Sequence, residues 1–219
     1  MKDGYIKVGC VSFDTNVGSP ILNTKNIIKC MNNANKKEVK ILVFPELCIS
    51  GYTCGDLFYQ DLLLEGCLDS LESIRRSSTR KDMLIVVGLP LKHNSKLYNV
   101  ACFINKGKIL GFVPKTYIPN YNEFYESRYF APAFKGNTKV VIRGNEYPFG
   151  VNLLFKCKSV SDLVVAGEIC EDLWVPSSPS INHALNGATV ICNLSASNEV
   201  VGKDKLRLDL VKFTSRKLC

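Results

Sequence analysis

The chain has 219 residues, 46% of them hydrophobic, which is enough to bury the core of one domain. Its 28 lysines and arginines against 20 aspartates and glutamates give a formal charge of +8. These basic residues are scattered and no apolar run has the length of a membrane span, so we expect neither a nucleic-acid-binding nor a membrane protein.

The cysteines and histidines exclude two further kinds of chemistry. Ten cysteines are present, but the chain begins with a strand pattern rather than a signal peptide, so we expect reduced thiols and a cytoplasmic protein. Cys10, Cys102 and Cys192 lie within apolar runs, where cysteine packs as a small hydrophobe. No Cys-x-x-Cys occurs, and His93 and His183 lie far apart. We therefore expect no metal site.

The hydrophobic pattern predicts strands and helices that alternate along the chain. Strands are expected over residues 5–13, 40–45, 83–89, 97–104, 108–113, 138–142, 147–155, 162–166 and 188–194. Helices are expected over residues 23–36, 61–76, 179–186 and 203–218. Turn sequences at 105–107 and 144–145 predict two hairpins. This mixture predicts an α/β fold in which two mixed sheets pack together with helices outside.

Three of the apolar runs end at a reactive side chain: Glu46, Lys115 and Cys170. In α/β sheets the carboxyl ends of strands are where sites assemble. A cysteine thiolate is a nucleophile, and a glutamate can take its proton and return it to a leaving nitrogen. A lysine beside both would stabilise an oxyanion and keep the glutamate and the thiolate charged. With only two histidines in the chain, these residues predict cleavage of an amide through a thioester, with a carboxylate as the base.

The sequence around these residues resembles the nitrilase superfamily of carbon-nitrogen hydrolases. The matching motifs are Phe-Pro-Glu-Leu at 44–47, Pro-Lys-Thr-Tyr-Ile-Pro at 114–119 and Glu-Ile-Cys-Glu-Asp at 168–172. The resemblance implies an α-β-β-α sandwich and a Glu46–Lys115–Cys170 triad.

Longer motifs resemble the glutaminase domain of glutamine-dependent NAD synthetases. They occupy residues 51–58, 119–130, 171–174 and 193–197. This resemblance implies that glutamine is hydrolysed to glutamate and ammonia. A synthetase part, which needs ATP and Mg, then uses the ammonia to amidate deamido-NAD. The resemblance implies no cofactor for the glutaminase domain itself, and it implies assembly into homo-oligomers.

The same motifs imply roles for further residues. Glu126 resembles a second glutamate near the triad that orients the lysine or the substrate. Five other residues resemble the lining of the glutamine pocket: Tyr52, Tyr121, Phe124, Glu171 and Ser197. For the aromatic residues among them, ordinary core packing is the alternative, and Glu171 could instead cap a turn.

The Ser-Gly-Gly-x-Asp-Ser phosphate loop of the synthetase part does not occur in the sequence. The chain stops at Cys219, directly after a predicted helix. We therefore expect residues 1–219 to be a nitrilase-like glutaminase domain that is truncated at its C-terminus and lacks the synthetase domain. Three alternatives remain: a free-standing amidase or carbamoylase acting on a small amide, a non-catalytic platform for oligomerisation, and a nucleic-acid-binding protein.

Overall fold

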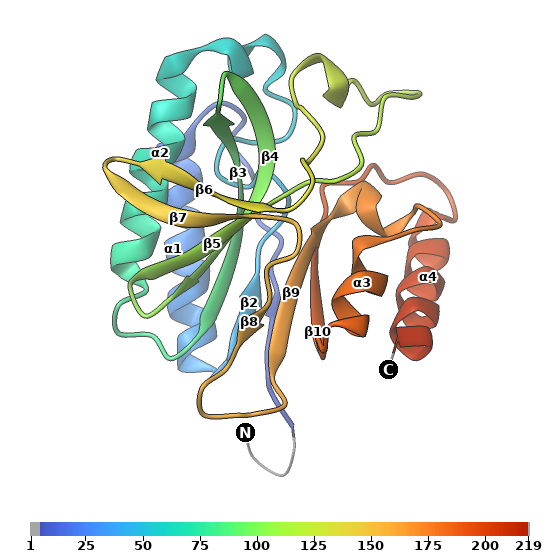
Figure 1. The fold of residues 1–219 in the computed structure, drawn as a ribbon. Helices are drawn as coiled ribbons and strands as arrows, with labels where there is room; N and C mark the ends of the chain where they lie inside the picture. Colours follow the sequence, from blue (N-terminus) through green and yellow to red (C-terminus); the bar gives the residue numbers. More distant parts are fainter. Residues whose placement is uncertain (1–4, 219) are drawn as a thin grey trace.

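Two β-sheets lie face to face in the computed structural model, which describes residues 5–218, and helices cover both outer faces (Figure 1). The helices are α1 (Pro20–Lys36), α2 (Asp61–Ser77), α3 (Pro179–Leu185) and α4 (Lys203–Leu218), with short 3-10 turns η1 (Gly55–Tyr59), η2 (Glu126–Arg128) and η3 (Cys170–Leu173). The strands are β1 (Val8–Cys10), β2 (Ile41–Val43), β3 (Leu84–His93), β4 (Lys96–Asn105), β5 (Lys108–Pro114), β6 (Asn137–Ile142), β7 (Asn145–Gly150), β8 (Phe155–Lys156), β9 (Val164–Ile169) and β10 (Val190–Leu194).

Both sheets are mixed, as the sequence predicts. The larger sheet has the order β1-β2-β3-β4-β5-β7-β6, and the smaller one has the order β10-β9-β8. Strands β1, β2 and β3 are parallel, whereas β3, β4 and β5 pair antiparallel. In the smaller sheet β10 is parallel to β9 and β8 is antiparallel to it. The predicted α-β-β-α arrangement of two mixed sheets is thus confirmed.

The apolar residues form two cores, one on each side of the larger sheet. The first lies between this sheet and helices α1 and α2, where Ile27, Met31 and Leu71 are buried. The second lies between the two sheets and includes Phe103 of β4 and Val165 of β9. Burial of these side chains from water is the main force that holds the layers together.

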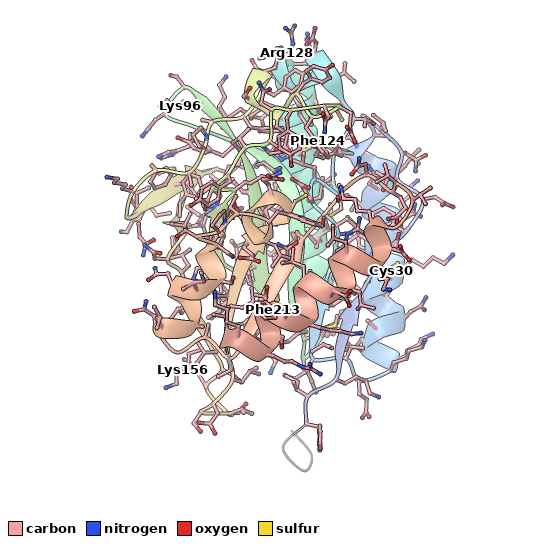
Figure 2. The ribbon with its side chains drawn as sticks, turned by 90° about the vertical axis from the view of Figure 1, so that its right-hand side faces the viewer. Cys30, Lys96, Phe124, Arg128, Lys156 and Phe213 are labelled. Atoms are coloured by element: carbon pink, nitrogen blue, oxygen red, sulfur yellow. The ribbon has the colours of Figure 1, made fainter. Side chains whose placement is uncertain are left out.

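Helix α4 differs from the other helices. None of its residues is buried, although it carries apolar side chains at Leu206, Leu208, Val211 and Phe213. Figure 2 looks onto this side of the molecule, with Phe213 in front. The predicted helix is confirmed, but these four side chains remain about half exposed or more within residues 5–218. No helix in these residues is both long and apolar enough to cross a bilayer.

The two predicted hairpins are confirmed. Lys106 and Gly107 join β4 to β5, and Arg143 and Gly144 join β6 to β7, each pair with positive φ angles. Two successive residues with positive φ are typical of a type I′ turn, whose twist matches that of the strands. The second turn is one residue earlier than predicted. A third hairpin, between β3 and β4, was not predicted; its turn also has positive φ angles, at Asn94 and Ser95.

Two predicted strands are wrong in extent. Within residues 5–13 only Val8–Cys10 forms a strand, and the Cys10 side chain is exposed rather than buried. The reason is that β1 is the edge strand and pairs only with β2. The predicted strand 147–155 is divided, because β7 ends at Gly150 in the larger sheet and the chain then crosses to β8 in the smaller one. Cys102 and Cys192 are buried as expected.

Candidate active site

The three predicted catalytic residues lie just beyond the ends of three strands. Glu46 follows β2, Lys115 follows β5 directly, and Cys170 follows β9 directly. Strand β2 is parallel to β3. The pairs β3–β4 and β4–β5 are both antiparallel. Strands β2 and β5 therefore run in the same direction, so Glu46 and Lys115 come to the same edge of the larger sheet. Cys170 reaches them from the smaller sheet.

Glu46 is held on all sides in a site that leaves it 2% exposed. Its Oε1 atom accepts hydrogen bonds from Lys115 Nζ and Asn99 Nδ2, both at 2.7 Å. Its Oε2 atom accepts one from the backbone N–H of Ala196 at 3.1 Å. The turn that carries Glu46 packs tightly on β3: a Cβ at Gly88 would stand 2.3 Å from the Leu47 nitrogen. Only glycine fits at that position.

Lys115 is fully buried between two carboxylates. Its Nζ atom donates to Glu46 Oε1 at 2.7 Å and to Glu126 Oε1 at 2.6 Å, and the Tyr52 hydroxyl donates to the same Glu126 oxygen at 2.7 Å. Burial alone would lower the pKa of Lys115, but Glu46 and Glu126 outweigh it and hold this pKa above its ordinary value. Lys115 is therefore a charged ammonium at neutral pH.

Cys170 is 6% exposed and has a backbone φ of +46°. A left-handed backbone costs a non-glycine residue about 1–2 kcal/mol, so its neighbours must hold it in place. The sharp turn from β9 into η3 places this side chain at the strand end. The Ser195 hydroxyl donates to Cys170 Sγ at 3.4 Å.

The expectation that Lys115 would keep the Cys170 thiolate charged is wrong for the protein without substrate. Burial and the negative charge of Glu46 raise the pKa of Cys170 to about 12, although Lys115 and Ser195 act in the opposite direction. Burial and Glu46 likewise raise the pKa of Glu126, against the effect of Lys115. At neutral pH Cys170 is thus a thiol, and it needs a base to become a nucleophile.

A second group of predicted residues lies beside Cys170. The Tyr121 hydroxyl donates to Glu171 Oε2 at 2.8 Å, and the Tyr121 and Phe124 rings meet edge to face with centroids 5.6 Å apart. Burial and the hydrogen bond to Glu171 raise the pKa of Tyr121 to about 12. The Lys203 ammonium lies 5.8 Å from the Phe124 ring centre.

Ser197 is the least engaged of the predicted pocket residues. It is partly buried in the segment after β10, next to Ala196, which contacts Glu46. Its hydroxyl makes no hydrogen bond to the described residues. The structure thus brings Tyr52 and Glu126 to the triad, gathers Tyr121, Phe124 and Glu171 beside Cys170, and leaves Ser197 nearby without a partner of its own.

The sequence analysis gave no role to Asn99, Ser195 and Ala196, which contact Glu46 or Cys170 directly. It also gave none to Asp172, which binds the backbone next to Lys115 and next to Cys170. A signal for Asn99 was available, because it is a polar residue inside an apolar strand and is 1% exposed in the structure. Buried polar groups of this kind are nearly always hydrogen-bonded to something specific. Asp172 and Ser195 lie within the motifs at 168–172 and 193–197, but a motif does not show that Asp172 meets Thr116 across 56 positions or that Ser195 meets Cys170 across 25.

Other polar features of the surface do not compete with this site. A hollow of about 580 Å³ beside α2 is lined by arginines. Those arginines are already paired, because Arg75 and Arg76 both donate to Glu72, and Arg143 donates to Asp69. Within residues 5–218 no group of three or more His, Cys, Asp or Glu side chains is placed to hold a metal ion.

The chemistry available to this arrangement is nucleophilic attack on a carbonyl group. In such a reaction Cys170 could act as the nucleophile and Glu46 as the base, beside the fixed positive charge of Lys115. Because Glu46 Oε1 is occupied by Lys115 and Asn99, its Oε2 atom is the one left with capacity to accept a proton. A buried ammonium that needs no reorientation is an effective stabiliser of an oxyanion.

Comparisons with known proteins agree with this description. The family model for carbon-nitrogen hydrolases matches residues 19–211. The glutamine-dependent NAD(+) synthetase of Mycobacterium leprae is 37% identical over 214 residues, which are 98% of this chain and 32% of that protein. The mouse (Mus musculus) protein of the same name is 31% identical over 205 residues. The chain thus spans about a third of the length of these curated relatives.

Solved structures have the same fold. A glutamine-dependent NAD(+) synthetase from Cytophaga hutchinsonii superposes with a TM-score of 0.82 at 31% identity, over 97% of this chain and 34% of that one. An amidase from Nesterenkonia superposes with a TM-score of 0.72 at 15% identity, over 95% of this chain and 71% of that one. At that identity the amidase supports the fold alone.

Proposed function

Because this chain is a member of the carbon-nitrogen hydrolase family, we propose that it hydrolyses the side-chain amide of glutamine as the glutaminase part of a glutamine-dependent NAD synthetase. The observation that carries the proposal is the fully buried Lys115 between Glu46 and Glu126, beside the Cys170 thiol. The names of the relatives at 37% and 31% identity supply the substrate.

The proposed reaction has two halves. In the first, Glu46 takes the thiol proton, Cys170 Sγ attacks the amide carbon, and Lys115 stabilises the oxyanion. Glu46 then gives the proton to the amide nitrogen, and the C–N bond breaks. Ammonia departs, and the glutamyl group stays bound to Cys170 as a thioester. In the second half Glu46 takes a proton from water, the resulting hydroxide attacks the thioester carbon, and the C–S bond breaks. Glu46 returns the proton to Cys170 Sγ, so that glutamate leaves and the free thiol is restored.

The substrate pocket in this proposal comprises the residues that surround the triad. Tyr52 and Glu126 lie on the Lys115 side and Tyr121, Phe124 and Glu171 on the Cys170 side, and Ser197 completes the lining. Glu126 has the strongest support as a positioning group, because one of its oxygens accepts from Lys115 and Tyr52. Its other oxygen, Oε2, is buried without a hydrogen-bond partner among the described residues.

We infer that the ammonia serves an ATP- and Mg-dependent amidation of deamido-NAD. That step belongs to a synthetase part outside residues 1–219, so none of its chemistry is assigned to the residues described here. A cytoplasmic location fits the nine cysteines of the described residues, all of which are free thiols.

Release of ammonia from glutamine tests the proposal. We expect the wild-type chain, alone or joined to its synthetase part, to release ammonia from glutamine but not from acetamide. C170A should abolish this release, and C157A, which removes a partly exposed cysteine at the opposite end of β9 from Cys170, should leave it unchanged. Hydrolysis of acetamide or an N-carbamoyl amine in preference to glutamine would instead favour a free-standing amidase or carbamoylase.

A homo-oligomer is the assembly that the resemblance implies. Light scattering on the purified protein at high concentration should give a mass that is a multiple of 24.4 kDa for this chain. A single monomeric species at high concentration would contradict the proposed assembly, without bearing on the chemistry of the triad.

A further inference from the structure

The Asp172 carboxylate is buried beneath the candidate active site and accepts hydrogen bonds from three backbone N–H groups. Its side chain belongs to η3, two residues after Cys170, and is 1% exposed. Oδ1 accepts from Thr116 N at 3.0 Å and from Tyr117 N at 2.8 Å. Oδ2 accepts from Ile169 N at 3.0 Å, with Thr116 N also at 3.3 Å. All three donors are main-chain groups.

These donors come from the two sheets. Thr116 and Tyr117 follow Lys115 at the end of β5 in the larger sheet, and Ile169 ends β9 in the smaller sheet immediately before Cys170. The two sheets are separate hydrogen-bonded units. Asp172 therefore ties the backbone next to Lys115 to the backbone next to Cys170.

The Cys170 backbone needs such a tie. Its φ of +46° is unfavourable for a residue with a side chain, so the turn persists only if its surroundings hold it. The Ile169 N–H bond to Asp172 Oδ2 closes this turn across three residues, with the Cys170 peptide inside it. Asp172 thus acts on the direction in which Cys170 Sγ points.

We propose that Asp172 is a positioning residue that sets the distance between Cys170 Sγ and the Lys115–Glu46 pair. The proposal rests on the amide hydrolysis proposed above. It also predicts an effect on the reactivity of Cys170 that can be measured without glutamine, so the two proposals can fail separately.

Replacing the Asp172 carboxylate by an amide tests the link that its hydrogen bonds make between the two backbone segments, with almost no change in shape. D172N keeps one acceptor oxygen and places an NH₂ group where the other oxygen was. The oxygen can serve Thr116 and Tyr117, but the NH₂ group then faces the Ile169 N–H and cannot accept from it. The left-handed turn loses its closing hydrogen bond, and we expect Cys170 Sγ to move away from Glu46.

E168Q is the matched control. Glu168 lies on β9, two residues before Cys170, and is 1% exposed, as Asp172 is. Its carboxylate accepts from Ser178 Oγ at 2.8 Å and Ser180 N at 3.1 Å, which hold the start of α3 on the smaller sheet. It makes no hydrogen bond to the segment after Lys115. E168Q therefore removes a buried, hydrogen-bonded carboxylate close to the same turn but leaves the hydrogen bonds of Asp172 in place.

The experiment compares the wild type, D172N and E168Q by kcat and KM for glutamine, by the urea midpoint, and by the pH dependence of Cys170 alkylation with iodoacetamide. We expect D172N to lose about a hundredfold in kcat, because a displacement of about 1 Å costs that much. KM should change far less. The pKa of Cys170, read from alkylation, should fall from about 12 towards its ordinary value in D172N as the thiol leaves Glu46 and becomes exposed. E168Q should change neither kcat nor the pKa of Cys170, even if its urea midpoint falls.

A D172N protein with wild-type kcat and an unchanged Cys170 pKa would overturn the proposal. Equal losses of kcat in D172N and E168Q, each in proportion to the fall in urea midpoint, would also overturn it, because the effect would then be one of stability alone. If the wild type does not hydrolyse glutamine, the proposed function fails, and the alkylation profile still decides the role of Asp172. Should D172N not fold, the smaller D172S leaves room for a water at the three N–H donors, and the same comparison applies.

Discussion

At the scale of single residues, the charge balance of the buried site assigns the roles of its members. One ammonium, that of Lys115, stands between the carboxylates of Glu46 and Glu126, and the Cys170 thiol lies beside Glu46. Burial alone would lower the pKa of Lys115, yet the carboxylates raise it. The ammonium is the fixed charge of the site, and Cys170 is the group that must lose a proton during the reaction.

Replacing Glu46 by glutamine removes both its negative charge and its action as a base, and each loss has its own measurable effect. We expect E46Q to lose about 10²–10⁴-fold in kcat/KM for glutamine, because the general base is gone. The same change should lower the pKa of Cys170, because Glu46 is one of the charges that raise it. Thiolate absorbance against pH measures this shift, and E146Q, at an exposed carboxylate of β7, is the control. Retention of glutamine hydrolysis in E46Q would contradict the assigned role.

Asp172 predicts a specific dependence of stability on pH. Burial, opposed by the backbone donors at Ile169, Tyr117 and Thr116 and helped by the nearby Glu168 carboxylate, raises the pKa of Asp172 from an ordinary 3.8 to about 7. Between those pH values the native state binds more protons than the unfolded state, so the free energy of unfolding falls as pH rises. A shift of this size corresponds to about 4 kcal/mol.

The comparison of wild type with D172N isolates this effect. The difference in free energy of unfolding, wild type minus D172N, should decrease as pH rises from 4 to 8, because D172N has no carboxyl to ionise. Urea unfolding at a series of pH values measures the difference. A difference that is constant over this range would show that Asp172 ionises at the same pH in the native and unfolded states.

At the scale of elements, the site depends on how closely the two sheets approach one another. Gly167 of β9 lies against Phe103 of β4, where a Cβ would stand 2.7 Å from the ring. Phe103 is in turn stacked on Phe155 of β8 with ring centres 4.0 Å apart. Glycine at position 167 thus lets β9 lie close to the larger sheet and bring Cys170 to Lys115.

G167A should therefore destabilise the protein and also impair catalysis. Overpacking of this kind costs about 1–3 kcal/mol, and the displaced β9 would carry Cys170 with it. G66A is the control: Gly66 lies in α2, where a Cβ would have ordinary contact distances, and alanine should stabilise this helix by up to about 1 kcal/mol. Thermal unfolding with ammonia release measures both effects. A G167A protein as stable and active as the wild type would contradict this account of the interface.

The sequence predicts an element well when the interactions that form it are between residues close together in the chain. Helices α1 and α2 follow from apolar residues at helical spacing, and the β4–β5 turn follows from Lys106 and Gly107. The split of 147–155 between two sheets is set by which strands pair, and an apolar run alone cannot reveal that.

The same limit applies within the site. That Glu46, Lys115 and Cys170 lie together could be predicted, because each ends an apolar run and stands in a recognisable motif. Their supporting contacts could not, because Asn99 meets Glu46 across 53 positions and Asp172 meets Thr116 across 56. The pKa of Cys170 was mispredicted for a related reason: its burial and its closeness to Glu46 exist only in the folded protein.

At the scale of the whole molecule, Glu46, Lys115 and Cys170 all lie within a chain that spans about a third of the length of its curated relatives. The cysteines offer an internal standard for testing this arrangement. A hydrogen bond from Ser159 lowers the pKa of Cys157, whereas burial raises that of Cys170 to about 12. A reagent that selects by thiolate content alone will therefore modify Cys157 before Cys170.

The most direct test of the central claim is mass spectrometry of the intact protein and its peptides after exposure to an electrophilic glutamine analogue, with and without free glutamine. We predict a single adduct on Cys170, absent in C170A and prevented by glutamine, while Cys157 stays unmodified. That result would place the nucleophile and a glutamine-shaped pocket within these 219 residues. Labelling of Cys157 or of several cysteines, without protection of Cys170 by glutamine, would contradict the assignment of this site to glutamine hydrolysis.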